Sequence, residues 1–361
     1  MTADETQALA ELRAYLAGTP QESRIVCLHD CDADGVAAGV VWQRAMERLG
    51  YTDIVRVIPD RERNAWTLEN RKRVAEAFDS GNSTTRRLFV LDLGSQSNPV
   101  APGVSTCFID HHHPEGVPPG DTLISSYLWD PIPNTSLMVY DLFGALTDVT
   151  DLDWVAAIGT ISDLGDQAAF PLVEQTKKKY TAKYLKEVTA LVNAARRSSR
   201  YEPEVAAEAL LAFTDPKSLF LSADIAVDRL KEDRAEVAAA LAEAKKAAPT
   251  FAGQVALVRI HSACQIHPLI AQIWRSRLPK YIVICANDGF LPGRVNFSAR
   301  GSDGTNVLQF LRDIDLGLEE GEGNYGHGHD AASGGSLPVE QWEKLLEAIG
   351  FERQPVKQSK P

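Results

Sequence analysis

The sequence predicts an α/β protein of two domains, with an N-terminal, mainly parallel sheet flanked by helices, a helical connector and a smaller C-terminal α/β domain. Short apolar runs alternate with helical patterns over residues 24–166, which is typical of parallel strands covered on both faces. Helical patterns then dominate residues 171–250, and strand-like runs return from residue 254. At 361 residues, the chain is long enough for two domains with cores of their own.

Composition limits the class of protein. Hydrophobic residues at 44% and charged residues at 24% are ordinary for a globular chain, and no apolar run approaches the roughly 20 residues of a membrane span. The N-terminus is acidic and has no signal-peptide pattern. The five cysteines are scattered and never spaced as CxxC, which indicates reduced thiols. We therefore expect a cytoplasmic protein without membrane contact, and the sequence leaves a homodimer open.

The negative charge is concentrated in the first half of the chain. The formal net charge is -12, and residues 1–170 hold 25 acidic against 12 basic side chains. Such a chain is a poor candidate for gripping long duplex DNA, because that grip relies on basic side chains that neutralise phosphates. A site for divalent cations, however, carries surplus carboxylates when it is counted without its ions. The acidity therefore favours a metal site.

The spacing of apolar residues predicts the strands and helices of the first half of the chain. We expect strands at residues 24–28, 53–58, 88–91 and 106–109, and helices at residues 5–17, from about Val36, at 68–78, 137–146 and from Asp153. Asn134, Thr135 and Ser136 are expected to cap the helix that begins near Leu137. Gly159 is expected to let the helix from Asp153 approach the sheet closely.

Acidic side chains follow the first strand. Residues 29–35 are His-Asp-Cys-Asp-Ala-Asp-Gly, and the alternation puts the carboxylates of Asp30, Asp32 and Asp34 on one side of an extended segment. Like charges so close repel one another, and a bound dication removes that penalty. A plain N-cap needs only one aspartate. Gly35 allows a sharp turn into the following helix.

Two further strands end in ionisable side chains. Asp92 directly follows residues 88–91; taken alone it is a cap or turn residue, but in a series of strand ends it is predicted to be a bridging ligand. Residues 110–113 are Asp-His-His-His and follow the strand at 106–109. Open α/β sheets place ligands at the C-terminal ends of their strands. Asp163 follows the apolar face of the helix from Asp153 and is a further candidate ligand.

Several common chemistries are disfavoured. The chain has no GxGxxG after its first strand, no Gly-Lys-Ser/Thr loop and no GxSxG elbow, so dinucleotide, P-loop and serine-hydrolase sites are not predicted. Carboxylate and imidazole ligands without thiolate suit Mn²⁺, with Mg²⁺ as the alternative ion. Six candidate ligands suit two ions about 3.5–4 Å apart that activate water for in-line attack on phosphorus.

Residues 29–35, Asp92, Asp110-His111-His112 and Asp163 together resemble the DHH phosphoesterase superfamily, which includes RecJ-like exonucleases and short-oligonucleotide nucleases. The resemblance implies one Mn²⁺ at Asp30, Asp32 and Asp92, and a second at Asp34, Asp92, His111 and Asp163. It also implies that Asp110 orients a ligand histidine and that His112 touches the substrate phosphate or protonates the leaving group. The first ligand position falls on Asp30, with His29 as the alternative. His113 lies outside the triplet and is expected to be a bystander.

The second half begins with helices. Residues 171–200 are expected to form one long basic helix that leaves the first domain, with a face that either lines a phosphate-binding cleft or is simply solvated. A second helix at 223–248 is expected to pack on it or to connect the domains. Strands are expected at 255–260, 281–285 and 293–300, helices at 268–277 and 306–312, and a glycine-rich loop at 321–335, for which a flexible linker is the alternative.

This half resembles the DHH-associated C-terminal domain. Ser298-Ala299-Arg300 matches that domain's Ser-x-Arg strand, and residues 326–329 match its Gly-Gly-Gly-His loop except that His327 replaces a glycine. By this resemblance Ser298, Arg300, Gly328 and His329 would hold the end of the substrate. The expected regions are a catalytic domain at 1–170, a helical connector at 171–250, a substrate-binding domain at 251–350 and a tail at 351–361.

The function expected from the sequence is metal-dependent hydrolysis of phosphodiester bonds in short or single-stranded nucleic acid, at a site in the cleft between the domains. One alternative is a phosphatase or phosphodiesterase acting on a small nucleotide, either bisphosphorylated or a cyclic dinucleotide. The other is a catalytically silent relative that only binds, which the complete set of ligands argues against. The sequence does not distinguish DNA from RNA, or one strand end from the other.

Overall fold

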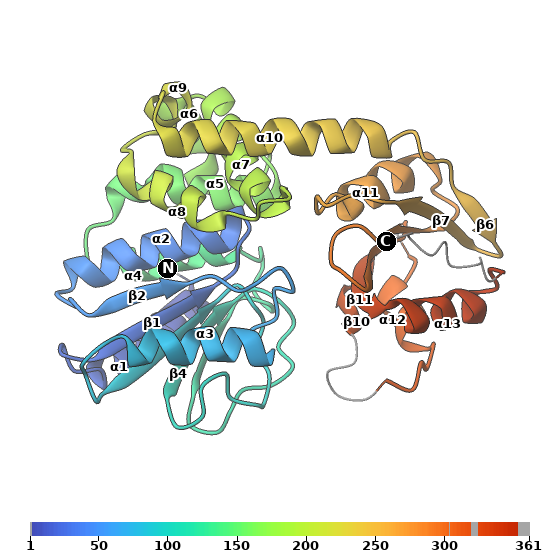
Figure 1. The fold of residues 1–361 in the computed structure, drawn as a ribbon. Helices are drawn as coiled ribbons and strands as arrows, with labels where there is room; N and C mark the ends of the chain where they lie inside the picture. The colour runs from blue at the N-terminus through green and yellow to red at the C-terminus, as the bar shows by residue number, and fades with distance from the viewer. Residues whose placement is uncertain (1, 303, 319–323, 353–361) are drawn as a thin grey trace. The chain divides into compact units, whose positions relative to one another are not determined.

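The computed structural model describes residues 2–302, 304–318 and 324–352 (Figure 1). The chain divides into two compact units, one formed by residues up to Arg196 together with Arg200–Arg234, the other by Arg197–Ser199 together with the residues from Ala235 onward. Each unit has its own sheet and its own hydrophobic core. The predicted α/β class, with a parallel N-terminal sheet and a second, smaller α/β part, is confirmed.

The sheet of the first unit is entirely parallel. Its five strands lie in the order β2-β1-β3-β4-β5, and every neighbouring pair runs parallel. The strands are β1 (Arg24–His29), β2 (Ile54–Val57), β3 (Arg86–Leu91), β4 (Ser105–Asp110) and β5 (Thr122–Ser125). Only β5 was not predicted, because its four residues stand between turns and give too short an apolar run. The C-terminal ends of β1, β3 and β4 therefore meet at one edge of the sheet.

Helices cover both faces of this sheet, which explains the continuous apolar runs of the central strands β1, β3 and β4. They are α1 (Ala3–Ala17), α2 (Ala33–Arg48), α3 (Leu68–Asp79), α4 (Thr135–Gly144), the 3₁₀ turn η1 (Thr150–Leu152) and α5 (Asp153–Leu164). Ile25 and Cys27 of β1 face a core built with α1, α2, α4 and α5. Their neighbours Val26 and Leu28 face a smaller core around Val74 and Phe78 of α3.

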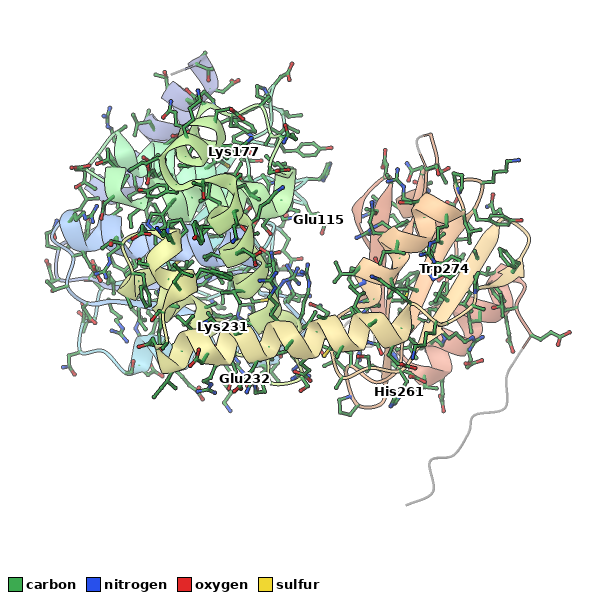
Figure 2. The ribbon with its side chains drawn as sticks, turned by 90° about the horizontal axis from the view of Figure 1, so that it is seen from above. Glu115, Lys177, Lys231, Glu232, His261 and Trp274 are labelled. Atoms are coloured by element: carbon green, nitrogen blue, oxygen red, sulfur yellow. The ribbon has the colours of Figure 1, made fainter. Side chains whose placement is uncertain are left out.

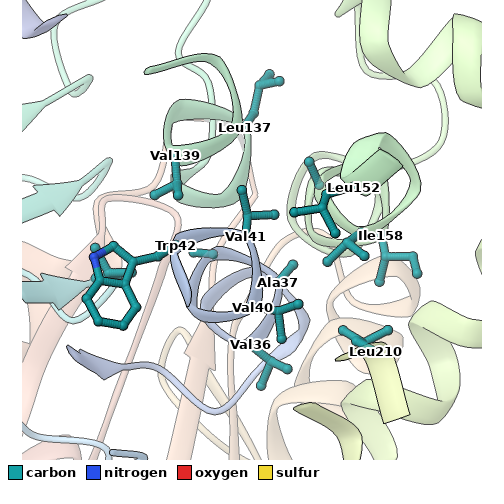
Figure 3. Close-up of a cluster of buried hydrophobic side chains, with 14 of the residues drawn as sticks. Val36, Ala37, Val40, Val41, Trp42, Leu137, Val139, Leu152, Ile158 and Leu210 are labelled. Carbon is teal, nitrogen blue, oxygen red and sulfur yellow. The ribbon is translucent and has the colours of Figure 1, made fainter. Parts of the chain in front are cut away.

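Helix α2 is buried along most of its length. Figure 3 shows Val36, Val40 and Val41 of α2 among side chains from α4, α5 and the segment around Leu210. The helix begins at Ala33, one turn earlier than predicted, because the Asp32 carboxylate accepts hydrogen bonds from the N–H groups of Asp34 at 3.1 Å and Gly35 at 3.2 Å.

Gly159 brings helices together rather than a helix and the sheet, so that part of the prediction was wrong. A Cβ built on Gly159 would lie 2.1 Å from Ser136 Oγ of α4 and 3.2 Å from Ala37 Cβ of α2. The missing side chain lets α5 pack closely on both helices. This contact matters for the site, because it ties the C-terminal part of α5 to the N-terminal ends of α2 and α4.

The single basic helix predicted at residues 171–200 was also wrong. Two helices, α6 (Pro171–Tyr180) and α7 (Ala182–Arg197), meet at Thr181, whose φ of 67° is incompatible with a continuous α-helix. Lys179 pairs with Asp153 at 2.8 Å, and Lys177 pairs with Glu174 at 2.8 Å, so part of the basic face is neutralised within its own unit.

Three further helices follow: α8 (Pro203–Ala212), α9 (Pro216–Leu221) and α10 (Ile225–Ala244). Helices α8 and α9 were not predicted from the sequence. Helix α10 belongs to both units, because the boundary between them falls between Arg234 and Ala235. Glu232 is an exposed residue of this helix (Figure 2). The helix that leaves the first unit is therefore α10, the alternative expected for the second helical stretch. None of the helices in the described ranges is both long enough and apolar enough to cross a membrane.

The second unit contains a mixed sheet of six strands in the order β10-β11-β9-β8-β7-β6. They are β6 (Thr250–Ala252), β7 (Val255–Ile260), β8 (Ile282–Asn287), β9 (Arg294–Arg300), β10 (Asn324–His329) and β11 (Ala332–Pro338). Only the β7–β8 pair is parallel. The helices are α11 (His267–Arg277), which carries Trp274 (Figure 2), α12 (Val307–Arg312) and α13 (Val339–Ile349). The apolar face of α13 packs on the sheet through Trp342, whose ring centroid lies 5.1 Å from that of Phe297 on β9.

The glycine-rich segment at 321–335 is not a loop where the structure describes it. Residues 324–329 and 332–338 form the antiparallel strands β10 and β11. Residues 321–323 and the tail from residue 353 lie outside the described residues.

Candidate metal centre

Acidic and histidine side chains gather at the C-terminal edge of the parallel sheet. Asp30 directly follows β1, Asp92 directly follows β3 and Asp110 is the last residue of β4. These three strands are neighbours in the sheet, so their ends are brought close together. The edge is completed by the N-terminal turn of α2, which holds Asp34, and by the last turn of α5, which holds Asp163.

The potential ligand atoms form three groups. Within each group the atoms lie within 4.8 Å of one another; the groups are Asp30, Asp32 and Asp92; Asp34, His111 and Asp163; and Asp92, His111 and His112. His111 Nε2 is central, at 3.3 Å from Asp92 Oδ1, 3.6 Å from Asp163 Oδ2 and 3.9 Å from Asp34 Oδ2. The structure thus brings together all six residues that the sequence predicted as ligands, and Asp92 is shared between groups.

Asp34 is buried and tied to the start of α4. Its Oδ1 accepts hydrogen bonds from Asn134 Nδ2 at 2.6 Å and from the Ser136 N–H at 2.7 Å, and its Oδ2 accepts one from the Thr135 N–H at 3.1 Å. Helix α4 therefore begins at Thr135 and is capped by Asp34 of α2, whereas the sequence predicted a cap from Asn134, Thr135 and Ser136 themselves. Burial and the nearby Asp163 raise the pKa of Asp34 to about 7.

Asp92 combines burial with an unusual backbone. Its φ is 64°, in the left-handed region that aspartate tolerates better than most residues. Its Oδ1 accepts a hydrogen bond of 2.9 Å from Thr135 Oγ1. Burial and the charge of Asp34 raise the pKa of Asp92 above its usual value. The negative charges of these two buried carboxylates repel each other, and a divalent cation bound between them would offset that repulsion.

Asp110 and His112 form a separate pair beside these ligands. Asp110 Oδ1 lies 2.9 Å from His112 Nδ1 and accepts the His112 backbone N–H at 2.6 Å, while its Oδ2 accepts the Gly94 N–H at 2.7 Å. Burial opposes both charges, yet His112 keeps the pKa of Asp110 below its usual range and Asp110 raises the pKa of His112 to about 9. Asp110 thus orients His112, the histidine that the resemblance assigned to the substrate, and the ring of His112 lies 4.3 Å from that of His111.

Asp30 and Asp32 share a partner, Arg63, that was not predicted from the sequence. Arg63, from the loop between β2 and α3, donates from Nε to Asp30 Oδ1 at 2.9 Å and from Nη2 to Asp32 Oδ2 at 2.9 Å. Nη2 also contacts Asp30 Oδ2. Arg196 of α7 is farther away, with Nη2 at 3.7 Å from Asp32 Oδ2. Nothing in the spacing of the loop distinguishes Arg63 from the neighbouring Arg61.

The two remaining histidines of the motifs play other parts. His29 is fully buried, its Nδ1 lies 2.8 Å from the Asp30 carbonyl oxygen, and its ring packs on Gly39 of α2. Burial, reinforced by Arg56, lowers the pKa of His29 to about 3. His29 is in none of the three ligand groups found among the described residues, which favours Asp30 for the position that the sequence left open. His113 is exposed, with its ring edge-on to Tyr127 at 4.9 Å.

No protein-family model matches the chain, and no curated protein is similar to it in sequence. Solved structures do match. RecJ from Thermus thermophilus in complex with Mn²⁺ matches at a TM-score of 0.65 and 18% identity over 98% of this chain. An exonuclease RecJ bound to manganese matches at 0.62 and 18% over 98%, and the DHH domain of a member of a family of ribosomal proteins matches at 0.64 and 15% over 96%. The chain shares the fold of these RecJ and DHH-domain structures.

The matched structures differ in how much of their own length this chain covers. The chain spans 56% of the Thermus thermophilus protein, 96% of the second RecJ structure and 90% of the DHH-domain protein. The predicted resemblance is thereby confirmed at the level of the DHH fold.

The residues present at this edge of the DHH fold suit divalent cations. The donors are carboxylate oxygens and imidazole nitrogens, a combination that suits Mn²⁺ or Mg²⁺. The raised pKa values of Asp34 and Asp92 are a second indication, because a cation offsets the repulsion that raises them. The five cysteines of the chain are buried and stand outside the three ligand groups, so thiolate is not part of the centre.

The predicted substrate-binding residues of the second unit lie on adjacent strands. Arg300 of β9 is paired with Ala332 of β11, and Ala332 is paired in turn with His329 of β10, so the backbones of Arg300 and His329 share one row of the sheet. Gly328 pairs with Ser333 in the next row. Ser298 is buried on β9 beside Gly334, where a Cβ would lie 2.5 Å from the Phe297 carbonyl oxygen. Burial and Arg275 lower the pKa of Arg300.

Proposed function

We propose that this protein is a metal-dependent phosphoesterase that hydrolyses phosphodiester bonds of short or single-stranded nucleic acid. The observation that carries the proposal is that the three ligand groups are linked: Asp92 joins the Asp30 and Asp32 group to His111, and His111 belongs in turn to the group with Asp34 and Asp163. The DHH fold supports it, because two of the solved structures with this fold are RecJ proteins in complex with manganese.

We propose Mn²⁺, with Mg²⁺ as the weaker alternative, as the ion at both positions. Asp30, Asp32 and Asp92 would hold one ion, and Asp34, Asp92, His111 and Asp163 would hold the other. When bound, such a pair of ions supplies an activated water and offsets the charge that develops on the phosphate. The protein's own part is to fix the ligands, which it does through the hydrogen bonds that α4 donates to Asp34 and Asp92.

His112 is the proposed proton donor to the leaving oxygen. Asp110 Oδ1 lies 2.9 Å from its Nδ1, so Asp110 fixes the orientation of the ring beside the ligand groups. Its pKa of about 9 keeps the ring protonated at neutral pH, the state that a general acid requires. Asp110 acts through His112 by fixing its orientation, and its own contacts with the backbone N–H groups of Gly94 and His112 keep it ionised.

The second unit is proposed to hold the end of the substrate. Arg300 and His329 share one row of its sheet, and Ser298 and Gly328 lie on the same two strands. An arginine guanidinium suits a phosphate because it donates two parallel hydrogen bonds. These residues would select the terminal nucleotide without taking part in the chemistry.

Charge favours a second candidate substrate, a small nucleotide that is bisphosphorylated or cyclic. Residues 1–170 hold 25 acidic against 12 basic side chains, which disfavours a long phosphate backbone more than a short one. The test is to incubate the purified protein and Mn²⁺ with end-labelled single strands of graded length, a bisphosphorylated nucleotide and a cyclic dinucleotide. Faster turnover of the strands supports the first proposal, faster turnover of the small nucleotides supports the second, and no turnover of any of them contradicts both.

A further inference from the structure

The carboxylates of Asp30 and Asp32 are already engaged by an arginine. Arg63 contacts both oxygens of Asp30 through Nε and Nη2, and its Nη2 also lies 2.9 Å from Asp32 Oδ2. Asp30 Oδ1 accepts the Cys31 backbone N–H at 2.7 Å as well. Asp30 is 4% exposed, so these are charge-assisted hydrogen bonds in a largely dry environment. The Arg63 guanidinium therefore occupies the position that a metal ion shared by Asp30 and Asp32 would take.

The loop that carries Arg63 is held in place from two sides. The Asn70 side chain of α3 accepts the Asp60 N–H at 2.8 Å, and the Tyr201 hydroxyl donates to the Pro59 carbonyl oxygen at 2.7 Å. Arg63 itself has a φ of 55°, a left-handed conformation that costs energy for a residue with a side chain. Such backbone strain persists where the surroundings impose it, and it often accompanies function. The contact of Arg63 with the carboxylates is therefore built into the fold.

The rest of the centre is held by groups of a different kind. Asp34 accepts hydrogen bonds from the N–H groups of Thr135 and Ser136, and Asp92 accepts one from Thr135 Oγ1. The histidine His111 faces both of these carboxylates. Neutral dipoles orient carboxylates without cancelling their charge, and a histidine gives up its proton to a metal ion at little cost. A full guanidinium charge does neither.

We propose that Arg63 is a built-in counter-cation of the Asp30–Asp32 pair, which a metal ion must displace, so that the two metal positions differ in affinity and the Asp30–Asp32 position is the weaker. The inference rests on the proposed two-metal function. A dication entering this position breaks hydrogen bonds to an ion that cannot lose its proton. Arg196, at 3.7 Å from Asp32, adds repulsion of the same sign from a greater distance. At the other position His111 Nε2 lies 3.9 Å from Asp34 Oδ2, and a histidine can give up its proton to a metal ion, so it imposes no comparable penalty.

The test is calorimetric titration of Mn²⁺ into chelator-treated wild-type protein and the Arg63→Met variant. The matched control is Arg71→Met, because Arg71 of α3 binds the backbone carbonyls of Pro99 and Val100. We expect two Mn²⁺ equivalents with unequal affinity in the wild type. Arg63→Met should tighten the weaker site by roughly tenfold or more and leave the stronger site within about twofold, and Arg71→Met should change neither.

Two outcomes overturn the inference: equal affinities at the two sites of the wild type, or a gain at the weaker site of less than about threefold in folded Arg63→Met protein. Circular dichroism establishes folding before the titration. If Arg63→Met does not fold, Arg63→Gln decides by the same threshold, because its amide removes the charge and keeps a polar side chain at the same place. Wild-type protein that binds fewer than two Mn²⁺ ions contradicts the proposed function itself, which separates that failure from a failure of the Arg63 inference.

Discussion

Asp34 Oδ1 accepts a hydrogen bond of 2.7 Å from the backbone N–H of Ser136, so a proposed ligand on α2 caps the helix α4 that begins 101 residues later. The first turn of α4 offers unpaired N–H groups and the positive end of its dipole, and a carboxylate satisfies both. The same contact fixes the orientation of a carboxylate that the proposed metal ion needs. The start of α4 is therefore part of the proposed metal centre, although it contributes no proposed ligand.

The Asn134 side chain tests this relationship. It donates to Asp34 Oδ1 at 2.6 Å and to Ser136 Oγ at 2.8 Å. Asn134→Ala should lower the free energy of unfolding by about 1–3 kcal/mol, because it removes a donor from a buried carboxylate. Urea denaturation measures the change, with Asn82→Ala at an exposed turn as the control. An effect of Asn134→Ala no larger than that of the control would show that the contact is unimportant for stability.

Asp92→Asn should abolish turnover while the fold survives. Asparagine tolerates the φ of 64° at this position, so the backbone is preserved and the shared negative charge is lost. Turnover should fall by on the order of 100-fold or more, because losing even an indirect support of a metal ligand costs about 10–100-fold. The number of bound Mn²⁺ ions should fall as well. Asp79→Asn, at an exposed carboxylate of α3, is the control, and full Mn²⁺-dependent activity of Asp92→Asn contradicts the role of Asp92.

Gly39→Ala should destabilise the protein even though it places alanine in a helix. The new Cβ would lie 2.3 Å from His29 Cδ2 in the core between β1 and α2. Crowding should cost about 1–3 kcal/mol, more than the roughly 1 kcal/mol that alanine gains over glycine in a helix. Adding His29→Ala should relieve the clash, so the two changes should couple by about 0.5–3 kcal/mol in a double-mutant cycle. Simple additivity would contradict the contact, and loss of Mn²⁺ in His29→Ala would contradict the role of His29 in packing alone.

Arg300→Ala and His329→Ala should separate substrate binding from chemistry. Each should lose a charge-assisted hydrogen bond to the substrate, worth about 1.5–3 kcal/mol, and so lower kcat/KM on oligonucleotides. Both Mn²⁺ ions should remain bound, because these residues lie on the sheet of the second unit. Arg294→Ala is the control, since Arg294 on the same strand binds Ser336. Unchanged kinetics in both variants, or loss of Mn²⁺ in Arg300→Ala, would show the assignment to be wrong.

The gathering of these side chains could be predicted because the C-terminal ends of parallel strands lie at one edge of the sheet. Each of the apolar runs that form β1, β3 and β4 is followed by an ionisable residue, and strand ends in a parallel sheet meet at one edge. That reasoning needs only the strand pattern and the positions of Asp30, Asp92 and Asp110. It does not need the order of the strands, which the sequence alone did not reveal.

Other features of the fold and the site could not be predicted, because they depend on contacts that leave no pattern in the nearby sequence. The ion pair of Arg63 with Asp30 joins residues 33 positions apart through a loop whose course the sequence does not specify. The break between α6 and α7 falls at Thr181, which carries neither the glycine nor the proline that usually marks a helix end. Glycines at 326–335 predicted a loop, because glycine has low strand propensity, but Gly334 is needed where β11 passes close to Phe297.

The most direct measurement of the central claim is Mn²⁺-dependent hydrolysis of end-labelled single strands by protein from which metal has been exhaustively removed. The account predicts no cleavage after chelation, full cleavage when Mn²⁺ is restored and weaker cleavage with Mg²⁺, because the donors are carboxylates and imidazoles. Metal content measured on the same samples should rise to two Mn²⁺ ions per chain as activity returns. Undiminished cleavage in the chelated protein would contradict a metal centre built on Asp92 and His111.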